Sequence, residues 1–222
     1  MWFLLDACSD EKDSGLFDNF ENIHRAGKLS PTVLAAALSA SATESLLLNS
    51  ERIEHRFGSY GIDVLASEAG LRRSSLYSIE NDLHMCRTYA VVHFADEPDT
   101  HYGAEHGRVL DGNSLGEEFK SQGWAIHKQT LHIGSFDLQP NASQVSRLMQ
   151  ITDNRTLALH VYQLLLAKQD QVFKYATIIE AHHPDYLSHR DLLEIYQYDD
   201  SQALSAESVT KLVDLVSGST DE

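Results

Sequence analysis

The stretch from Leu157 to Leu187 constrains the fold of this chain more than any other. Its first half is rich in leucine and valine, a polar segment follows at 167–171, and its second half is rich in β-branched and aromatic residues. Residues of these kinds fit a pleated, half-buried surface, and two such runs joined by a short polar segment are typical of a β-hairpin. We therefore predict two antiparallel strands with a turn at 167–171.

The predicted hairpin ends on an acidic residue, Glu180. This residue follows two isoleucines and lies four residues before Pro184, which cannot donate a hydrogen bond to a neighbouring strand. Because side chains alternate between the two faces of a strand, Glu180 is expected to share its face with Ile178. A carboxylate at the exit of a buried strand can have a shifted pKa or bind a ligand. It can also be a solvated strand end or a cap for the next segment, and both interpretations are open.

Other segments show the periodicity of strands or helices. Alternating and β-branched runs predict strands at 62–65, 74–79, 85–95 and 124–138. Helical spacing and capping residues predict helices within 1–28 and at 30–48, 51–57, 114–119, 143–152, 188–198 and 203–216. Ser114, followed three residues later by Glu117, has the pattern of a capping box. The polar segment 96–107 is expected to be a loop.

The order of these elements predicts the fold class. Most strands are neighbours in sequence and are joined by short turns, whereas helices stand mainly at the ends, which is typical of an α+β fold. We predict an antiparallel β-sheet meander with helices packed on one face and at both termini. The expected parts are an N-terminal helical arm at 1–44, an α+β domain at 45–198 and a C-terminal helix at 199–222 that packs on the same domain.

The charge of the chain limits its partners. Its 222 residues include 17 lysines and arginines against 33 aspartates and glutamates, which gives a formal net charge of −16. Because phosphate binding needs a basic face, we expect neither nucleic acid nor a membrane as a partner. No uncharged apolar run approaches the roughly 20 residues that span a bilayer. Cys8 and Cys86 cannot form a disulfide framework, so the expected location is the cytoplasm and Cys86 is expected to be a structural thiol.

Two histidine-rich segments lack the spacing of a metal site. The segment from His101 to His106 contains one residue more than the H-x-x-E-H motif of inverted zinc proteases. His182 and His183 are adjacent, so they are expected to point to opposite faces of a strand and not to bind one metal side by side. The chain also lacks G-x-S-x-G, P-loop and G-x-G-x-x-G motifs. We therefore expect neither a metal ion nor a cofactor.

Four stretches, in order, resemble the chorismate lyase family and its relatives with the ligand-binding UTRA fold. Residues 46–57 are similar to the first helix of that family, and residues 75–92 are similar to its central hairpin. Asn113 to Gly116 resembles its Pro-Leu-Gly flap, and Glu180 to Pro184 resembles the Glu-x-x-x-Pro at the end of its last hairpin. Together these stretches span about residues 45–187.

The resemblance implies an enzyme that removes pyruvate from chorismate and leaves 4-hydroxybenzoate. This carbon–oxygen lyase reaction is an elimination that makes the ring aromatic, and it requires placed charges and exclusion of water but no metal and no cofactor. Glu180 would hold the ring hydroxyl of the substrate. Leu115 and Gly116 would cover the ligand, and Ile53 would line the pocket where the family has a methionine.

The arginine that would clamp the substrate carboxylate has three candidates. The family places this arginine on the first strand of the central hairpin, where this chain has Ser74. Arg72 and Arg73 lie one or two residues away, and Arg72 shares the face of Ser74. The planar guanidinium group of arginine bonds both oxygens of a carboxylate. A small shift of the strand could therefore restore the clamp, or Arg87 in the return strand could supply it.

Two functions are consistent with these observations. The first is a chorismate lyase or a close relative that acts on a small aromatic or cyclohexadienyl carboxylate. The second is a non-catalytic binding protein that keeps the cavity as a sensor or carrier, because Ser74 replaces the arginine of the family. Residues 1–45 are too acidic to provide a DNA-reading domain, so a regulator of this kind would act through protein contacts. The oligomeric state is left open.

Overall fold

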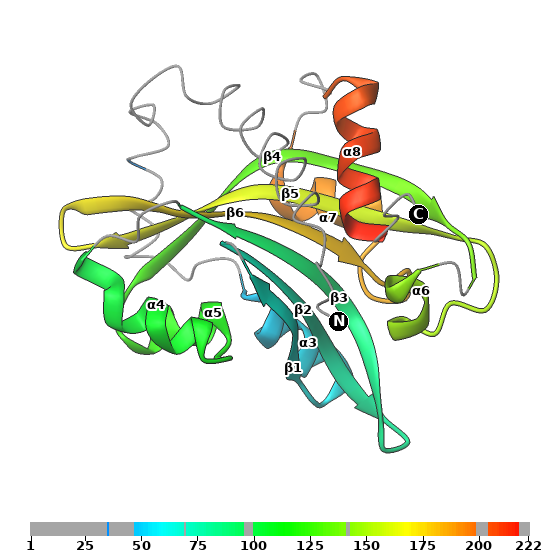
Figure 1. The fold of residues 1–222 in the computed structure, drawn as a ribbon, viewed down its shortest axis with the longest axis horizontal. Coiled ribbons are helices and arrows are strands. Elements are labelled where there is room, and N and C mark those ends of the chain that lie inside the picture. Colours follow the sequence, from blue (N-terminus) through cyan, green and yellow to red (C-terminus); the bar gives the residue numbers. More distant parts are fainter. Residues whose placement is uncertain are drawn as a thin grey trace, which may run out of the picture.

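The computed structural model describes residues 35, 47–68, 70–95, 100–140, 143–198 and 204–217 (Figure 1). The predicted N-terminal arm at 1–44 lies outside these residues, apart from Ala35 within a helix. Cys8 also lies outside them. Among the described helices, none combines the length and the apolar character that crossing a membrane requires.

Six strands form one sheet in which every neighbouring pair is antiparallel. The strands are β1 (Gly61–Glu68), β2 (Leu71–Glu80), β3 (Leu83–Phe94), β4 (Ala125–Leu138), β5 (Arg155–Lys168) and β6 (Gln171–His182). Their order across the sheet is β1-β2-β3-β6-β5-β4, so two three-stranded meanders join through β3 and β6. The predicted α+β class with an antiparallel meander is confirmed.

The hairpin at 157–187 is confirmed as β5 and β6, which lie in the middle of the sheet. The chain turns at Gln169 and Asp170, and Gln169 adopts a left-handed φ of +56°. The register places Glu180 directly opposite His160. Most residues of both strands are buried, because each strand has a neighbour on either side and helices above and below. Glu180 is therefore held on rigid, interior backbone.

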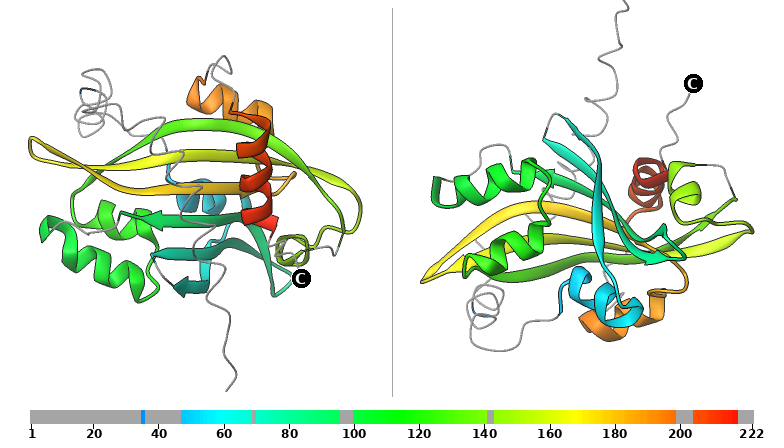
Figure 2. Two further views of the ribbon diagram at one scale, coloured as in Figure 1. Left: turned by 45° about the horizontal axis from the view of Figure 1, so that its top comes forward. Right: turned by 90° about the horizontal axis from the view of Figure 1, so that it is seen from below.

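Helices lie on both faces of the sheet (Figure 2). The described helices are α3 (Asn49–Phe57), α4 (Gly103–Leu110), α5 (Leu115–Ser121), α6 (Gln144–Leu148), α7 (His189–Tyr196) and α8 (Ala206–Ser217), with a 3-10 turn η1 at Thr100–Tyr102. Four of them, α3, α4, α5 and α7, cover one face, which we call the pocket face. The terminal helix α8 and the short α6 pack on the opposite face against β3 and β6. The sequence analysis predicted helices on one face of the sheet and at the termini. The structure adds that α6 and α8 lie on the opposite face.

Alternation of side chains along the strands divides the core between the two faces. On the face covered by α6 and α8, Val91, Val161 and Ile179 pack with Met149 and Leu212. Cys86 belongs to the same cluster as a free, buried thiol, and burial raises its pKa to about 12. A thiol with so high a pKa is unreactive at neutral pH, which agrees with its predicted structural role.

The segment 96–107, predicted to be a loop, is partly helical. Residues 96–99 lie outside the described residues, but Thr100–Tyr102 form η1 and Gly103–Leu110 form α4. The apolar contacts of Tyr102 and Val109, both buried on the pocket face, favour the helix. The loop prediction rested on the polar composition of this segment and on Pro98, Gly103 and Gly107. The long-range contacts outweigh the low helix propensity of the two glycines.

The short helix predicted after Ser114 is confirmed as α5, with Ser114 as its N-cap residue. The predicted capping box is wrong, because the Ser114 side chain makes no capping hydrogen bond. Its Oγ instead accepts a hydrogen bond from the Tyr60 hydroxyl at 3.2 Å. The side chain of Glu117 is hydrogen-bonded to Ser50 rather than to the backbone of the cap. Both side chains therefore connect α5 to other segments of the chain.

Candidate functional site

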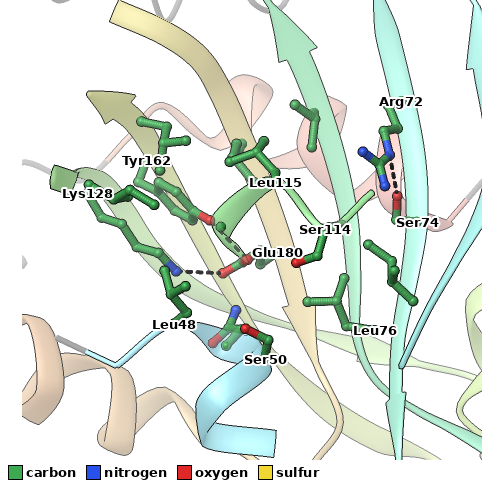
Figure 3. Close-up of a pocket in the computed structure, with 18 of the residues that line it drawn as sticks. Leu48, Ser50, Arg72, Ser74, Leu76, Ser114, Leu115, Lys128, Tyr162 and Glu180 are labelled. Atoms are coloured by element: carbon green, nitrogen blue, oxygen red, sulfur yellow. Dashed lines mark hydrogen bonds and ion pairs between the residues drawn. The ribbon is translucent and has the colours of Figure 1, made fainter. Parts of the chain in front are cut away.

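The pocket face contains a pocket to which all six strands contribute at least one side chain (Figure 3). It holds about 610 Å³ of space free of protein atoms, including its opening to solvent. The start of α3 and the start of α5 close it from the side opposite the sheet. Its apolar lining consists of Leu48, Ile62, Leu76, Ala90, Val92, Leu115, Ile126, Leu164 and Ile178. A mostly apolar lining with a few polar groups is typical of sites that bind small ring-bearing molecules.

Glu180 lies in the wall of this pocket that β6 forms, and only 4% of its surface is exposed. Its Oε1 accepts a hydrogen bond of 2.9 Å from the Tyr162 hydroxyl on β5. Burial and the nearby Glu180 carboxylate raise the pKa of Tyr162 well above its usual value, so Tyr162 is a neutral donor. The carboxylate is therefore fixed in direction and kept out of bulk water.

Lys128 on β4 approaches the same carboxylate from across β5 (Figure 3). Its Nζ lies 3.8 Å from Oε2 of Glu180 and 4.6 Å from the centre of the Tyr162 ring. The Lys128 side chain is only 11% exposed. At 3.8 Å the contact with Glu180 is an ion pair rather than a short hydrogen bond, so the ammonium group retains donors that can point into the pocket.

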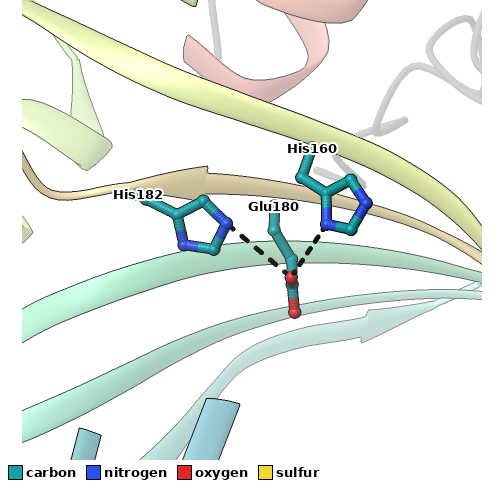
Figure 4. Close-up of side chains that lie close together, drawn as sticks. All are labelled: His160, Glu180 and His182. Atoms are coloured by element: carbon teal, nitrogen blue, oxygen red, sulfur yellow. Dashed lines mark ion pairs between the residues drawn. The ribbon is translucent and has the colours of Figure 1, made fainter. Parts of the chain in front are cut away.

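Two histidines face Glu180 from within the sheet (Figure 4). Oε2 of Glu180 lies 4.0 Å from Nδ1 of His160 and 3.8 Å from Nε2 of His182. Burial, with the charges of Lys128 and Arg52, lowers the pKa of His182 to about 4 despite the opposing effect of Glu180. Burial likewise lowers the pKa of His160 well below its usual value. Both imidazoles are therefore neutral at neutral pH.

Arg72 on β2 also lines the pocket, with β3 between its strand and that of Glu180, and it is 2% exposed (Figure 3). Its Nη1 donates hydrogen bonds to the carbonyl oxygens of Val109 at 2.9 Å and Asn113 at 3.0 Å, and its Nε donates to Ser74 Oγ at 3.1 Å. Among the described residues, its recorded hydrogen-bond partners are all uncharged. The guanidinium charge is therefore balanced by the carbonyl oxygens at the end of α4, which carry partial negative charge.

These hydrogen bonds also hold the flap that resembles the family's Pro-Leu-Gly segment. The connection between α4 and α5 leads to Leu115 and Gly116, which both line the pocket. A Cβ atom built on Gly116 would lie 2.9 Å from Cδ1 of Leu48, which is closer than side chains pack. Gly116 therefore permits α5 to approach the start of α3, and the two segments close the pocket together.

Three residues expected in the site lie elsewhere. Arg73 points to the opposite face of the sheet, where its Nη1 donates to the carbonyl oxygen of Leu215 in α8 at 2.8 Å. Arg87 forms an ion pair with Glu80 and lies 3.9 Å from the centre of the Phe57 ring. Ile53 is fully buried in the core beneath α3 and α7 and does not line the pocket. Of the predicted residues, Glu180, Arg72, Ser74, Leu115 and Gly116 are brought together.

Lys128 and Tyr162 were not predicted as site residues. Lys128 follows Ile126 by two residues in a strand that was correctly predicted, so alternation alone places its charge on the face of Ile126. A lysine on the apolar face of a strand is a signal that could have identified it. No comparable signal marks Tyr162, because aromatic residues are common in buried strands.

The histidine segment at 101–106 does not form one cluster. Glu105 accepts a hydrogen bond from Nε1 of Trp124 at 3.1 Å, and Nδ1 of His106 lies 2.9 Å from the Tyr175 hydroxyl. The ring of His101 packs against Phe173, with 5.2 Å between ring centres. Glu105 and His106 therefore pack with the aromatic core beneath α4 and α5, whereas His101 is exposed.

The pocket carries positive charge in an acidic protein. Its lining contains two cations, Arg72 and Lys128, and one carboxylate, Glu180. The whole chain has a formal net charge of −16. Because the interior is poorly screened, this local excess of one positive charge favours an anionic ligand.

No protein-family model matches the chain, and no curated protein matches it in sequence.

Proposed function

We propose that the pocket binds a small ring-bearing carboxylate and that the protein is a chorismate-lyase-like enzyme, which eliminates pyruvate from chorismate or a related cyclic acid. The observation that carries this proposal is that Glu180 and Arg72 both line one pocket, together with Leu115 and Gly116 of the flap. The resemblance in the sequence had placed a carboxylate, an arginine and a flap at the ligand.

The charges of the pocket suit a ligand with two carboxylates. Arg72 and Lys128 approach the pocket from β2 and β4, so two carboxylates of one ligand can each face a cation. Glu180 repels carboxylates but accepts hydrogen bonds, so a ring hydroxyl would lie against it. Ser50 and Ser114 supply further hydroxyl groups to the lining. The ligand would thus be oriented by its charged groups and by its hydroxyl.

The elimination itself needs little covalent help from the protein. The bond between a ring carbon and the enolpyruvyl oxygen breaks, the neighbouring hydroxyl-bearing carbon loses its hydrogen, and the ring becomes aromatic. The leaving enolpyruvate takes up a proton to become pyruvate, so the atoms balance. Lys128 would stabilise the negative charge that develops on the leaving oxygen, and Glu180 would accept the proton from the ring carbon. The apolar lining would exclude water.

Product analysis tests the enzyme. Purified protein is incubated with chorismate, and pyruvate and 4-hydroxybenzoate are quantified together. Equimolar formation of both, faster than spontaneous decomposition and abolished in Glu180→Gln, is expected. Absence of both products with folded wild-type protein rejects the lyase.

A non-catalytic binding protein is the second candidate, and one observation favours it. The hydrogen bonds of Arg72 to Ser74, Val109, Asn113 and Gly112 occupy four of the five donors of its guanidinium group. An arginine held in this way can attract a carboxylate by charge but cannot easily form the two parallel hydrogen bonds of a full clamp. Such a pocket could bind an aromatic acid without turning it over.

A thermal-shift series with aromatic acids separates this candidate from the first. Stabilisation should grow with ligand concentration as RT ln(1 + [L]/Kd). A shift with aromatic acids and no pyruvate from chorismate would favour the binding protein. No shift with any acid, even at millimolar concentration, would reject it.

A further inference from the structure

His160, Glu180 and His182 form a compact group of three buried side chains on the two central strands. Glu180 lies opposite His160, and His182 follows it by two residues on the same face of β6. One ligand atom of each residue lies within 4.8 Å of the other two. The adjacent His183 is not part of this group. Its Nδ1 accepts a hydrogen bond from the backbone N–H of Asp185 at 3.1 Å.

The three facing atoms are the ones without a hydrogen bond. Nδ1 of His160, Oε2 of Glu180 and Nε2 of His182 are all buried, and none has a hydrogen-bond partner. Buried polar atoms in proteins normally have a hydrogen-bond partner, so three unpaired atoms that face one another make a candidate binding site. The group has the composition of a metal site, with two imidazoles and one carboxylate.

The outer nitrogens of both histidines are fixed by threonines. Nε2 of His160 lies 3.1 Å from Oγ1 of Thr130, and Nδ1 of His182 lies 3.0 Å from Oγ1 of Thr88. When these outer nitrogens carry the hydrogen, the inner nitrogens present lone pairs toward Glu180. Histidines that bind metals are oriented in this way by a second hydrogen bond, which fixes the tautomer and the direction of the ring.

We propose that His160, Glu180 and His182 bind one divalent transition metal ion of the zinc class. With zinc bonds of about 2.0–2.2 Å, tetrahedral ligand atoms lie roughly 3.4 Å apart. The present separations from Oε2 are 4.0 Å to His160 and 3.8 Å to His182. The two histidine nitrogens lie within 4.8 Å of each other. Contractions of about half an ångström toward Oε2, and of up to about 1.4 Å between the histidines, would bring three ligands to bonding distance and leave the fourth position open.

Charged and hydrogen-bonding groups around the three residues affect how strongly they would bind the ion. Oε1 of Glu180 stays with Tyr162, so only Oε2 is needed for the metal. Lys128 lies 3.8 Å from Oε2, and its charge opposes a cation at the same oxygen. The charge of Arg52 also acts on both histidines. Because burial keeps both imidazoles neutral, they need not lose a proton to bind the ion.

This inference goes beyond the proposed function, which requires no metal. Its test therefore measures binding of the ion without any substrate. A negative chorismate assay leaves the metal proposal standing, and a negative metal titration leaves the lyase proposal standing. Full-length protein without a histidine tag is treated with a chelator, freed of the chelator and titrated with ZnCl₂ by calorimetry. CoCl₂ serves as a spectroscopic probe of low coordination number, and MgCl₂ serves as a hard cation that prefers oxygen ligands.

About one equivalent of zinc is expected to bind to the wild type, with no heat from magnesium. His160→Gln and His182→Gln should each lower the zinc affinity by about 100-fold or more, because each removes a ligand. His183→Gln is the matched control and should bind as the wild type does. Lys128→Met should bind zinc about tenfold more tightly or better, since it removes the opposing charge.

Thr130→Val keeps all three ligands, so it tests the site even if the histidine variants fail to fold. It removes only the hydroxyl that orients His160 and should lower the zinc affinity by roughly 10–100-fold while circular dichroism stays unchanged. Folded wild-type protein that takes up no zinc would overturn the proposal and leave a buried water as the occupant. Zinc that binds equally well to His160→Gln and His182→Gln would overturn it as well.

Discussion

Arg72 and Arg73 are neighbours in β2, yet their guanidinium groups lie on opposite faces of the sheet. Arg72 enters the pocket and donates to the carbonyl oxygen of Val109 at 2.9 Å. Arg73 reaches α8 and donates to the carbonyl oxygen of Leu215 at 2.8 Å. The alternation of side chains along a strand thus separates one candidate site residue from the other and provides a matched pair for experiment.

Arg72→Met should destabilise the protein by about 2–5 kcal/mol, because it leaves the buried carbonyl oxygens of Val109 and Asn113 without donors. It should also weaken binding of an aromatic acid, since the flap loses its anchor and the pocket loses a cation. Arg73→Met removes the bond to Leu215 and should cost only about 1 kcal/mol without changing ligand affinity. Urea denaturation and ligand titration measure the two effects. Equal behaviour of the two variants would contradict the assignment.

Glu180→Gln keeps an oxygen that can accept the hydrogen bond of Tyr162. The free energy of unfolding should fall by up to about 3–5 kcal/mol, because the substitution leaves the buried ammonium group of Lys128 without the carboxylate 3.8 Å away. Turnover or ligand affinity should fall tenfold or more, because the negative charge at the ring hydroxyl is lost. Steady-state kinetics or calorimetry gives the result. A Glu180→Gln protein that binds and reacts as the wild type does would remove this residue from the site.

Lys128→Met tests whether the pocket attracts anions. The variant keeps the length of the side chain but loses the charge beside Glu180, so the affinity for an aromatic carboxylate should fall by about tenfold or more. Lys168→Met is the control, because Lys168 lies over the Trp124 ring outside the pocket lining and donates to the carbonyl oxygen of Gln122. Calorimetric titration of both variants with the same aromatic carboxylate measures the loss of affinity in each. An equal loss in both would indicate a long-range effect of charge rather than a contact in the pocket.

Gly116→Ala should reduce ligand affinity and stability together, since its Cβ would lie 2.9 Å from Leu48 in the pocket wall. A cost of about 1–3 kcal/mol is expected for such overpacking. Gly107→Ala is the control, because nothing lies within 4 Å of its Cβ position in α4. It should leave the protein unchanged or stabilise it by up to about 1 kcal/mol. Thermal unfolding of the two variants measures both effects. A Gly116→Ala protein as stable as the wild type would contradict this account.

The sheet could be predicted because its strands carry strong local signals. The hairpin of β5 and β6 has β-branched and aromatic runs around a short polar turn, and the structure forms it as expected. The loop prediction for 96–107 failed because the burial of Tyr102 and Val109 outweighs the glycines of α4. Local propensity cannot report contacts between segments that are distant in the sequence.

The site was only partly predictable for a similar reason. Glu180 could be identified from its place at the end of a strand, and the resemblance identified Leu115 and Gly116. The approach of Lys128 to Glu180 depends on the pairing of β4 with β5 and of β5 with β6, which the sequence does not specify residue by residue. The same holds for His160, which the register alone places opposite Glu180. Pairing across strands created these contacts, and no motif within one segment contains them.

Binding of a carboxylate is the claim shared by both candidate functions, and one titration tests it directly. The wild type is titrated calorimetrically with 4-hydroxybenzoate and with 4-hydroxybenzyl alcohol, which has the same ring and hydroxyl but no charge. With Arg72 and Lys128 in the lining, the acid should bind at least about tenfold more tightly than the alcohol, and added salt should weaken the acid alone. Equal affinity for the two compounds, or no binding of either, would contradict the account.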